Sequence, residues 1–327
     1  MKKNILAMGI AAAIAAPVAM AEAPTLYGQM NLGVTKVTNE GTNVIHRNSR
    51  LGIKGAKDLG NGLTAVYQLE GTVGHNEDYD AKLFNRNTFA GLAGGFGTVV
   101  MGRHDTPLRM IQPTDGFNDN VYLGNNTGRF NGFGGLDGGE HRLENVIAYI
   151  SPSFSGVQLA IAGTSTAVKE ADQALNNGIS ASVAYGSKRQ GLYAAAALTR
   201  VDKDHSLVDN KLDVQRVTIQ FAEAGLVVSG MYNTTKKGGN KTGNSLTFGV
   251  SQAVGDFTPR AKISRVSYED ASNSTNAAVG LDYALGKGTS LVAEVGRLDK
   301  NNQKGNKDAY SAGKATQAVY LGMNLSF

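Results

Sequence analysis

Apolar and polar residues alternate with a period of two along much of this chain of 327 residues. The alternation is clearest at 26–34 and 319–327, and it recurs at 63–69, 217–221 and 291–295. Because successive side chains of a β-strand point to opposite faces, each segment predicts a strand with one apolar and one polar face. Beyond the leader described below, no helical periodicity is sustained. We therefore expect an all-β fold.

Two kinds of connection separate the predicted strands. Seven tight turns, rich in Gly or carrying Pro, occupy 58–62, 94–97, 151–156, 186–191, 222–225, 254–259 and 286–288. Eight longer polar segments lie between them, at 38–46, 74–82, 105–140, 166–177, 202–211, 234–243, 268–275 and 299–314. Together these connections separate 16 antiparallel strands.

An even number of antiparallel strands, with turns at one end and long loops at the other, is typical of an outer-membrane β-barrel. A secreted β-sandwich or β-helix also alternates, but it rarely keeps such an asymmetry in connection length. A barrel of this size encloses an aqueous lumen rather than a packed core. We therefore predict a 16-stranded antiparallel transmembrane barrel.

The composition fits such a barrel and excludes several other classes of protein. Only every second residue of a barrel strand faces lipid, so 41% apolar residues are sufficient when they share one face. The chain has no Cys, which excludes disulfides, thiol nucleophiles and Cys-ligated metals. Its five His have no metal-ligand spacing, and no His-bearing catalytic triad is evident. We expect no enzymatic activity, cofactor, metal or nucleic-acid partner.

The first 21 residues form a predicted export signal. Lys2 and Lys3 precede an apolar stretch at 5–18, and the small residues at 19–21 fit a cleavage site. A retained or lipid-anchored helix is the alternative, but the stretch is short for a membrane span and Pro17 interrupts it. Cleavage after Ala21 leaves 22–327 as the barrel domain, and loss of the two lysines lowers the formal net charge from +5 to +3.

Several motifs carry a family resemblance. They are RLGIKG at 50–55, DLGNGL at 58–63, YQLE at 67–70, RNTFAGL at 86–92, GFGT at 95–98, MGR at 101–103 and SPSFSG at 151–156. In order and spacing they resemble the general porins of Gram-negative bacteria, and Phe327 resembles the terminal assembly signal of that family. The resemblance implies a homotrimer, inserted by the barrel assembly machinery into outer-membrane lipid and lipopolysaccharide. Small hydrophilic solutes and ions would diffuse through each barrel.

Strand parity places candidate basic residues on the lumen wall. If Leu51 and Ile53 face lipid or a neighbouring subunit, Arg50 and Lys54 face the lumen. A charge at mid-depth on the lipid face would cost about 2–4 kcal/mol, which favours the same assignment. The resemblance puts Arg50 in the basic ladder of a constriction; solvated wall residues are the alternative.

Two further arginines are assigned in the same way. With Phe89 facing outward, Arg86 points inward, and the resemblance places it in the same ladder. Arg142 shares parity with Glu144, opposite Ile147, and is expected to face the lumen near the mouth of the barrel. Ile150 stands where some relatives of that family carry a third wall Arg, so the ladder is expected to be thinner here.

The segment 105–140 is the third long connection. In the similar family this loop folds into the barrel and narrows it, and loops of this length are usually functional or disordered. Of the carboxylates at 115, 119 and 137, Asp115 and Asp119 are the candidates for the acidic side of the constriction. Facing basic wall residues, they would create a transverse field that orients solutes. The acidic Pro-Glu-Phe-Gly-Gly stretch of enteric relatives is missing.

Arg103 shares parity with Met101, which places it on the outer face near the loop end of the barrel. By resemblance this face contacts a neighbouring subunit, where Arg103 would pair with Glu77, Asp78 or Asp80 of an adjacent copy. The alternative is an interfacial Arg that reaches toward lipopolysaccharide phosphate.

We expect a general diffusion channel, and the net charge and basic wall favour a weak preference for anions. A solute-specific channel of the same fold is one alternative. A barrel that acts mainly as an adhesin or envelope anchor is another, and a soluble secreted binding protein is the most distant.

Overall fold

The computed structural model describes residues 23–38, 41–74, 84–114, 116–117, 139–165, 175–202, 210–301 and 315–327. The predicted leader at 1–21 therefore lies outside the part of the chain that can be described. Among the described residues, no helix is long and apolar enough to cross a membrane.

Nearly all regular structure in this part of the chain is β-strand. In chain order the strands are β1 (Thr25–Val37), β2 (Gly41–His46), β3 (Arg50–Gly60), β4 (Leu63–Thr72), β5 (Thr88–Gly94), β6 (Gly97–Asp105), β7 (Arg142–Ile150), β8 (Val157–Thr164), β9 (Gly178–Ser187), β10 (Gln190–Val201), β11 (Leu212–Glu223), β12 (Leu226–Lys237), β13 (Asn240–Gln252), β14 (Phe257–Tyr268), β15 (Ser274–Gly286), β16 (Thr289–Leu298) and β17 (Thr316–Ser326). One short helix, α1 (Pro107–Met110), follows β6.

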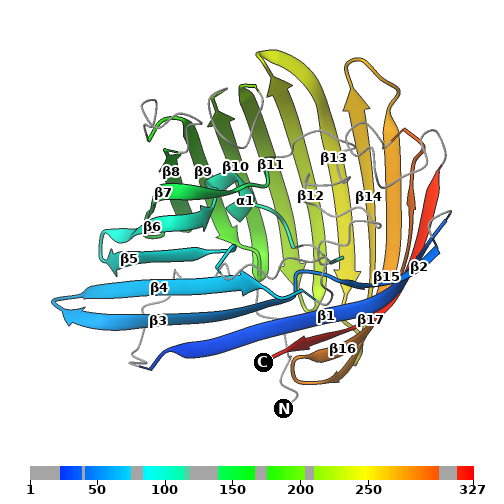
Figure 1. The fold of residues 1–327 in the computed structure, drawn as a ribbon, viewed down its shortest axis with the longest axis horizontal. Helices are drawn as coiled ribbons and strands as arrows, with labels where there is room; N and C mark the ends of the chain where they lie inside the picture. Colours follow the sequence, from blue (N-terminus) through cyan, green and yellow to red (C-terminus); the bar gives the residue numbers. More distant parts are fainter. Residues whose placement is uncertain are drawn as a thin grey trace.

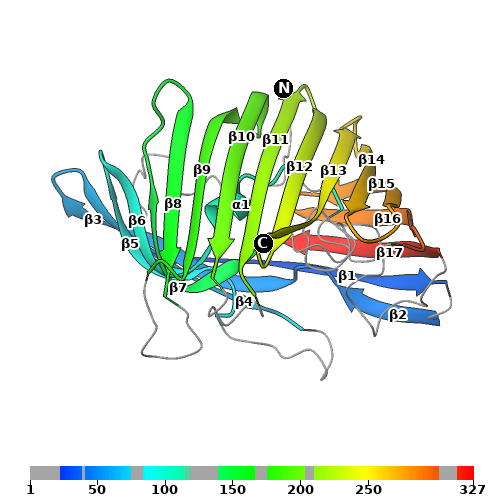
Figure 2. The same cartoon turned by 90° about the horizontal axis from the view of Figure 1, so that it is seen from above.

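These strands form one closed, antiparallel barrel (Figures 1 and 2). Apart from β2 and β3, each strand pairs with its neighbour in the chain, and β1 closes the barrel by pairing with β17. The other edge of β1 pairs with β2 over one half of its length and with β3 over the other half. Since β2 and β3 are two parts of one interrupted strand, the 17 segments make the 16 strands that the sequence predicts.

All seven predicted tight turns join consecutive strands at one end of the barrel. Two of the eight predicted long loops are wrong. The segment 234–243 forms the ends of β12 and β13 and a two-residue turn, in which Gly238 and Gly239 have positive φ of 60° and 87°. The segment 38–46 contains β2. Polar side chains suggested loops at both places, but ladder hydrogen bonds are made by the backbone, whatever the side chains are.

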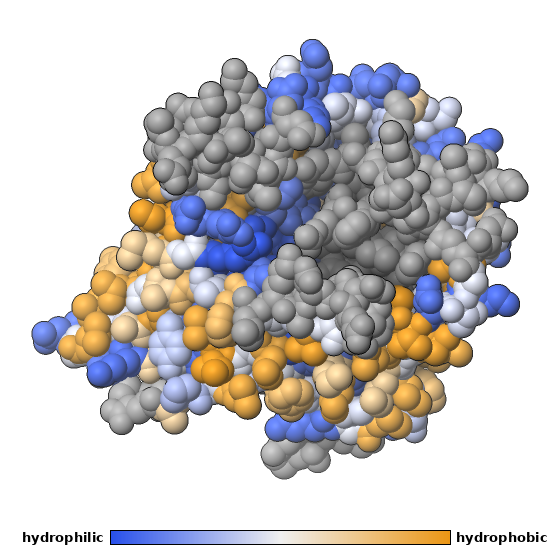
Figure 3. Space-filling model, viewed as in Figure 1, coloured by the Kyte–Doolittle hydropathy of each residue, from blue (hydrophilic) through white to orange (hydrophobic). Residues whose placement is uncertain are grey.

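The two faces of the wall have opposite character. On β11 the exposed positions include the apolar residues Val217 and Ile219, at 57% and 55% exposure, whereas the polar Thr218 and Gln220 between them are buried. This is the reverse of a water-soluble protein and matches a wall with lipid outside and a polar interior. Figure 3 shows apolar residues over the outside and hydrophilic residues in the hollow.

The chain turns inward after β6. Pro107 fixes the first turn of α1, and the hydroxyl of Thr106 accepts a hydrogen bond from the Arg109 backbone N–H. Leu108 is fully buried against Val201 and Leu212 on the inner face of the wall. The helix lies against β8, β9 and β10 inside the barrel (Figure 1). The first turn of the predicted inward-folded loop, α1, therefore lies inside the barrel.

Candidate functional site

The first charged cluster of the inner wall is centred on Glu70 of β4. Its carboxylate pairs with the Arg86 Nε at 2.6 Å and lies 3.7 Å from the Arg50 Nε. The Tyr27 hydroxyl donates a hydrogen bond of 2.9 Å to the same carboxylate. Arg50 also donates to Gln29, at 2.8 Å. Two of the predicted wall arginines therefore share one carboxylate, which sets their orientation.

Lys54 lies on the same face of β3 as Arg50, and its Nζ is 5.2 Å from the centroid of the Tyr27 ring. Leu51 and Ile53 are exposed on the opposite face, as the alternation predicts. The same alternation places Glu70 on the inner face, because its neighbour Leu69 is exposed on the outer face. The sequence prediction did not include Glu70 as a site residue.

The prediction that Phe89 faces outward is wrong, although Arg86 is buried and paired with an inner-wall residue, Glu70. Phe89 faces inward: it is 8% exposed, packs with Val100 and Leu143, and meets the His104 ring at a centroid distance of 5.1 Å. Arg86 lies two residues before β5 begins, so strand alternation does not extend to it. The Glu70 carboxylate and the Asn48 amide, 3.4 Å from its NH1, hold the guanidinium instead.

Arg142 does not share the surroundings of Glu144. Its NH2 pairs with the Asp105 carboxylate at 2.9 Å, and its Nε donates to Asn87 at 2.8 Å. The Glu144 side chain is 63% exposed and pairs with Arg103. The backbone breaks the alternation here, because Asn145 has a φ of 49° and the register between β6 and β7 shifts. Shared parity with Glu144 was therefore an incorrect premise for Arg142.

The same carboxylate ties the wall to the inward helix. Arg109 of α1 pairs with Asp105 at 3.0 Å, and its NH1 donates to the Glu140 backbone carbonyl at 2.7 Å. Glu140, where the chain returns to the wall, forms a buried ion pair with Arg216 of β11. Arg216 also donates to Asn233 at 2.7 Å. Both ends of the segment 105–140 are thus fastened to the wall by charge-assisted hydrogen bonds.

A third charged cluster includes side chains of β14, β15 and β16. Glu294 of β16 accepts from Arg47 at 2.7 Å and from Arg260 at 2.6 Å, and Arg260 also pairs with Asp282 at 2.6 Å. Arg260, Gly280 and Glu294 lie in register across β14, β15 and β16. A Cβ at Gly280 would be 3.1 Å from Arg260 Cζ and from Glu294 Cγ. Because glycine has no side chain, Arg260 can reach Glu294 across the intervening strand.

Phe117 connects the first part of the segment 105–140, called the inward segment below, to this cluster. Its side chain is 1% exposed and packs with Val37, Val292 and Tyr320. The ring centroid is 5.1 Å from Arg260 Cζ and 5.0 Å from Lys262 Nζ. The segment is fastened on the way by Thr114, whose backbone N–H donates to Gln220 at 2.8 Å. It therefore runs from α1, beside β8–β10, to the wall formed by β14–β17.

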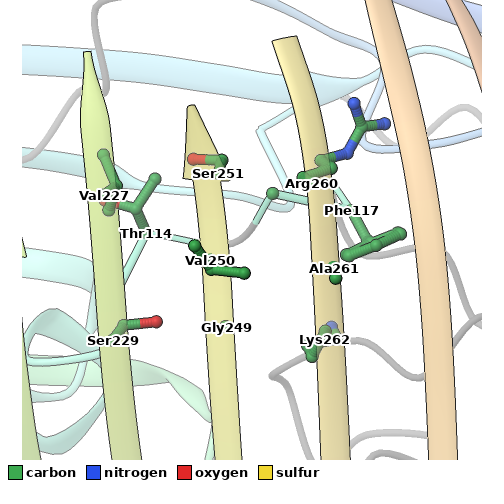
Figure 4. Close-up of a pocket in the computed structure, with 11 residues that line it drawn as sticks. Thr114, Phe117, Val227, Ser229, Gly249, Val250, Ser251, Arg260, Ala261 and Lys262 are labelled. Atoms are coloured by element: carbon green, nitrogen blue, oxygen red, sulfur yellow. The ribbon is translucent and has the colours of Figure 1, made fainter. Parts of the chain in front are cut away.

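A small pocket separates this segment from the wall. Figure 4 shows Thr114 and Phe117 facing Val227 and Ser229 of β12, Gly249–Ser251 of β13, and Arg260–Lys262 of β14. Its lining combines two basic side chains with two serine hydroxyls. Arg260 in this lining is already paired with Glu294 and Asp282, and the apolar side chains of Phe117, Val227 and Val250 complete the lining.

Lys188, in the turn between β9 and β10, holds the segment from the turn end. Its ammonium donates hydrogen bonds to the backbone carbonyls of Met110 and Gln112. Burial lowers the pKa of Lys188 to about 8, and the nearby Arg216 also lowers this pKa, whereas Glu140 opposes the shift. No sequence pattern predicts this contact, because it joins a turn to a loop that lies far away in the chain.

Arg103 lies on the outer face, beside Met101, which is 57% exposed. Its partner within the chain is Glu144, which was not foreseen. The predicted partners Glu77, Asp78 and Asp80 fall in a segment that is not described, as do the loop carboxylates Asp115 and Asp119. Phe327 is 62% exposed, and its backbone N–H and carbonyl both pair with Gly28, so the last residue completes the seam with β1.

The described interior carries more basic than acidic side chains. The basic ones are Arg47, Arg50, Lys54, Arg86, Arg109, Arg142, Arg216, Arg260 and Lys262, and the acidic ones are Glu70, Asp105, Glu140, Asp282 and Glu294. No group of three or more His, Cys, Asp or Glu in the described residues could hold a metal ion. The arrangement suits passive, electrostatically screened passage.

A family model that describes Gram-negative porins matches residues 7–303. The chain belongs to the Gram-negative porin family. Among curated relatives, this porin is 30% identical to the major outer membrane protein P.IB of Neisseria gonorrhoeae, in an alignment that covers 98% of this chain and 99% of the relative. Another P.IB, from Neisseria lactamica, is also 30% identical, over 93% of this chain and 96% of the relative.

Solved porins share the fold. The anion-selective porin from Comamonas acidovorans superposes with a TM-score of 0.75 at 22% identity, covering 93% of this porin and 99% of that chain. The trimer form of OmpT from Vibrio cholerae has a TM-score of 0.68 at 14% identity, with 93% and 99% coverage. The chain is thus an outer-membrane porin with the general architecture of these channels.

Proposed function

We propose that this porin is a general diffusion channel for small hydrophilic solutes and ions, with a weak preference for anions. The surplus of basic side chains on the described interior carries the proposal. Fixed positive charge on a narrow, partly desolvated wall concentrates anions and repels cations. The anion-selective porin from Comamonas acidovorans, which has the same fold, supports this direction.

The two sides of the constriction are part of this proposal. Arg50, Lys54 and Arg86 would form the basic wall, and Asp115 and Asp119 of the inward loop would form the acidic side. Glu70 moderates the wall, because it pairs with Arg86 and lies close to Arg50. One carboxylate between two arginines leaves a net positive charge, which fits a preference that is weak rather than strong.

Reversal potentials in a salt gradient across a planar bilayer test the proposal. The wild-type channel should give the sign expected for anions, and Arg86→Glu should shift the potential toward cation preference. Arg200→Gln is the matched control, because Arg200 faces outward and is paired with Asp213 at 2.6 Å. Cation selectivity of the wild type, or no shift in Arg86→Glu, would refute the proposed role of the wall.

The same proposal includes assembly. Export would remove residues 1–21, the barrel assembly machinery would recognise the strand that ends in Phe327, and three copies would associate among outer-membrane lipid and lipopolysaccharide. The trimeric OmpT neighbour supports the association. The Arg103–Glu144 pair would lie close to an adjacent copy, where Glu77, Asp78 or Asp80 could join it. The mass of the mature chain and cross-linking of purified membranes test these steps.

A further inference from the structure

Two cations project from the outer wall on β14 and β16, near the long-connection end of the barrel. Arg265 of β14 and Arg297 of β16 are exposed, and each shares its face with lipid-facing apolar residues. Neither forms an ion pair with any residue that the structure describes. The nearest carboxylates along the chain are engaged elsewhere: Glu269 pairs with Lys241 at 2.7 Å, and Asp299 accepts from the Asn301 backbone N–H at 2.9 Å.

The strand register brings the two arginines together. Arg265 pairs with Thr275 of β15, and Arg297 pairs with Ala277 of the same strand. Their own strands are therefore separated by β15 alone, about 10 Å from one strand to the other. Arg side chains are long enough to converge over that distance. Two guanidinium groups on one face form a site for an anion with several oxygen atoms, such as a phosphate.

The surface below the two arginines is apolar. Ile263 and Val295 are each 50% exposed, Val279 is 58% exposed, and Leu321 is 59% exposed. At the turn end the same strip finishes with Phe257 and Tyr283, whose ring centroids are 4.9 Å apart. Such an aromatic pair is typical of the membrane interface. This strip can therefore contact lipid acyl chains across the membrane, from one membrane–water interface to the other.

The position of Arg265 along the membrane normal agrees with a strip that spans the apolar layer. Arg265 is eight residues along β14 from Phe257, which is about 27 Å along the strand, or about 20 Å of height once a tilt of about 40° is included. An apolar band is about 25 Å tall, so an extended Arg side chain reaches its far edge. The guanidinium groups then lie at the headgroup level of the outer leaflet.

We propose that Arg265 and Arg297 form a binding site for a phosphate-bearing lipid of the outer leaflet, with its acyl chains on the apolar strip of β14–β17. A charge on a lipid-facing wall is unfavourable unless an opposite charge meets it. A lipid phosphate supplies that charge at the correct depth. The inference rests on the lipid surroundings of the proposed function, but it concerns the outer wall and not the lumen.

The test is a lipid titration followed by native mass spectrometry of the purified porin. The probes are bisphosphorylated lipid A and the same lipid A after enzymatic removal of its phosphates. The wild type should bind the phosphorylated form more tightly. R265Q/R297Q should weaken this binding roughly thirtyfold, the combined effect expected for two basic residues near an anionic surface. Arg200→Gln, at a similar height but already paired, should stay within about twofold of the wild type.

Conductance of the same preparations in phosphatidylcholine bilayers separates this site from the channel. R265Q/R297Q should conduct like the wild type, because both side chains point away from the lumen. Equal binding of the two lipid A forms by the wild type would overturn the site. So would undiminished phosphorylated-lipid binding by R265Q/R297Q, or a change in subunit stoichiometry in place of a change in lipid binding.

Discussion

Replacing Phe117 with Ala should release the inward segment from the far wall of the barrel. Phe117 is almost completely buried, and its ring fills the space between Tyr320, Val37 and Val292, close to Arg260 and Lys262. Truncation of a buried Phe to Ala costs about 3–5 kcal/mol, since apolar contact is lost and a cavity remains. The variant also lacks the cation–π contacts that Arg260 and Lys262 make with the ring.

This loss of free energy shifts the equilibrium between two states of the segment that carries Phe117: packed on the wall and detached from it. A loss of about 3–5 kcal/mol raises the detached population by a factor between about 150 and several thousand. The other attachments, at Thr114 and Lys188, remain in the variant. We therefore expect a barrel that folds normally but whose constriction fluctuates.

Single-channel recording in planar bilayers measures this change. Phe117→Ala should show frequent steps between conductance levels and a larger mean conductance than the wild type, and Phe117→Leu should show a weaker effect. Phe154→Ala is the matched control, because Phe154 lies between β7 and β8 and is 65% exposed. Current traces of Phe117→Ala that match those of Phe154→Ala would refute the view that Phe117 holds the segment.

Three further predictions concern the charged clusters. Glu70→Gln leaves Arg50 and Arg86 without their shared carboxylate, so reversal potentials should move toward stronger anion preference; movement toward cations would contradict the proposed wall. Gly280→Leu places a side chain between Arg260 and Glu294 and should destabilise the barrel by about 3–5 kcal/mol in urea unfolding, the cost of breaking a buried ion pair. If Gly280→Leu were as stable as Gly249→Ala, the Arg260–Glu294 pair would not depend on the absence of a side chain at Gly280. Arg103→Ala should lower the temperature at which the proposed trimer dissociates on gels, whereas an unchanged temperature would argue against an interfacial role.

Much of the inner wall could be predicted, because alternation is a local property. Arg50 and Lys54 lie on the face opposite the exposed Leu51 and Ile53, as alternation predicts, since β3 is regular over these residues. Local rules failed where the backbone departs from the regular strand. Phe89 was assigned to the wrong face. The irregularity at Asn145 separates Arg142 from Glu144, and no sequence pattern marks its position.

The sequence by itself determined that this chain forms a barrel with turns at one end and long connections at the other. It could do so because a period of two and Gly-rich turns act over a few residues. Tertiary structure decided which charges meet: Glu70 with Arg86, Glu140 with Arg216, and Arg260 with Glu294 across Gly280. It also decided where Phe117 is seated. These contacts join residues far apart in the chain, and they depend on strand register, closure of the barrel and the path of the inward segment.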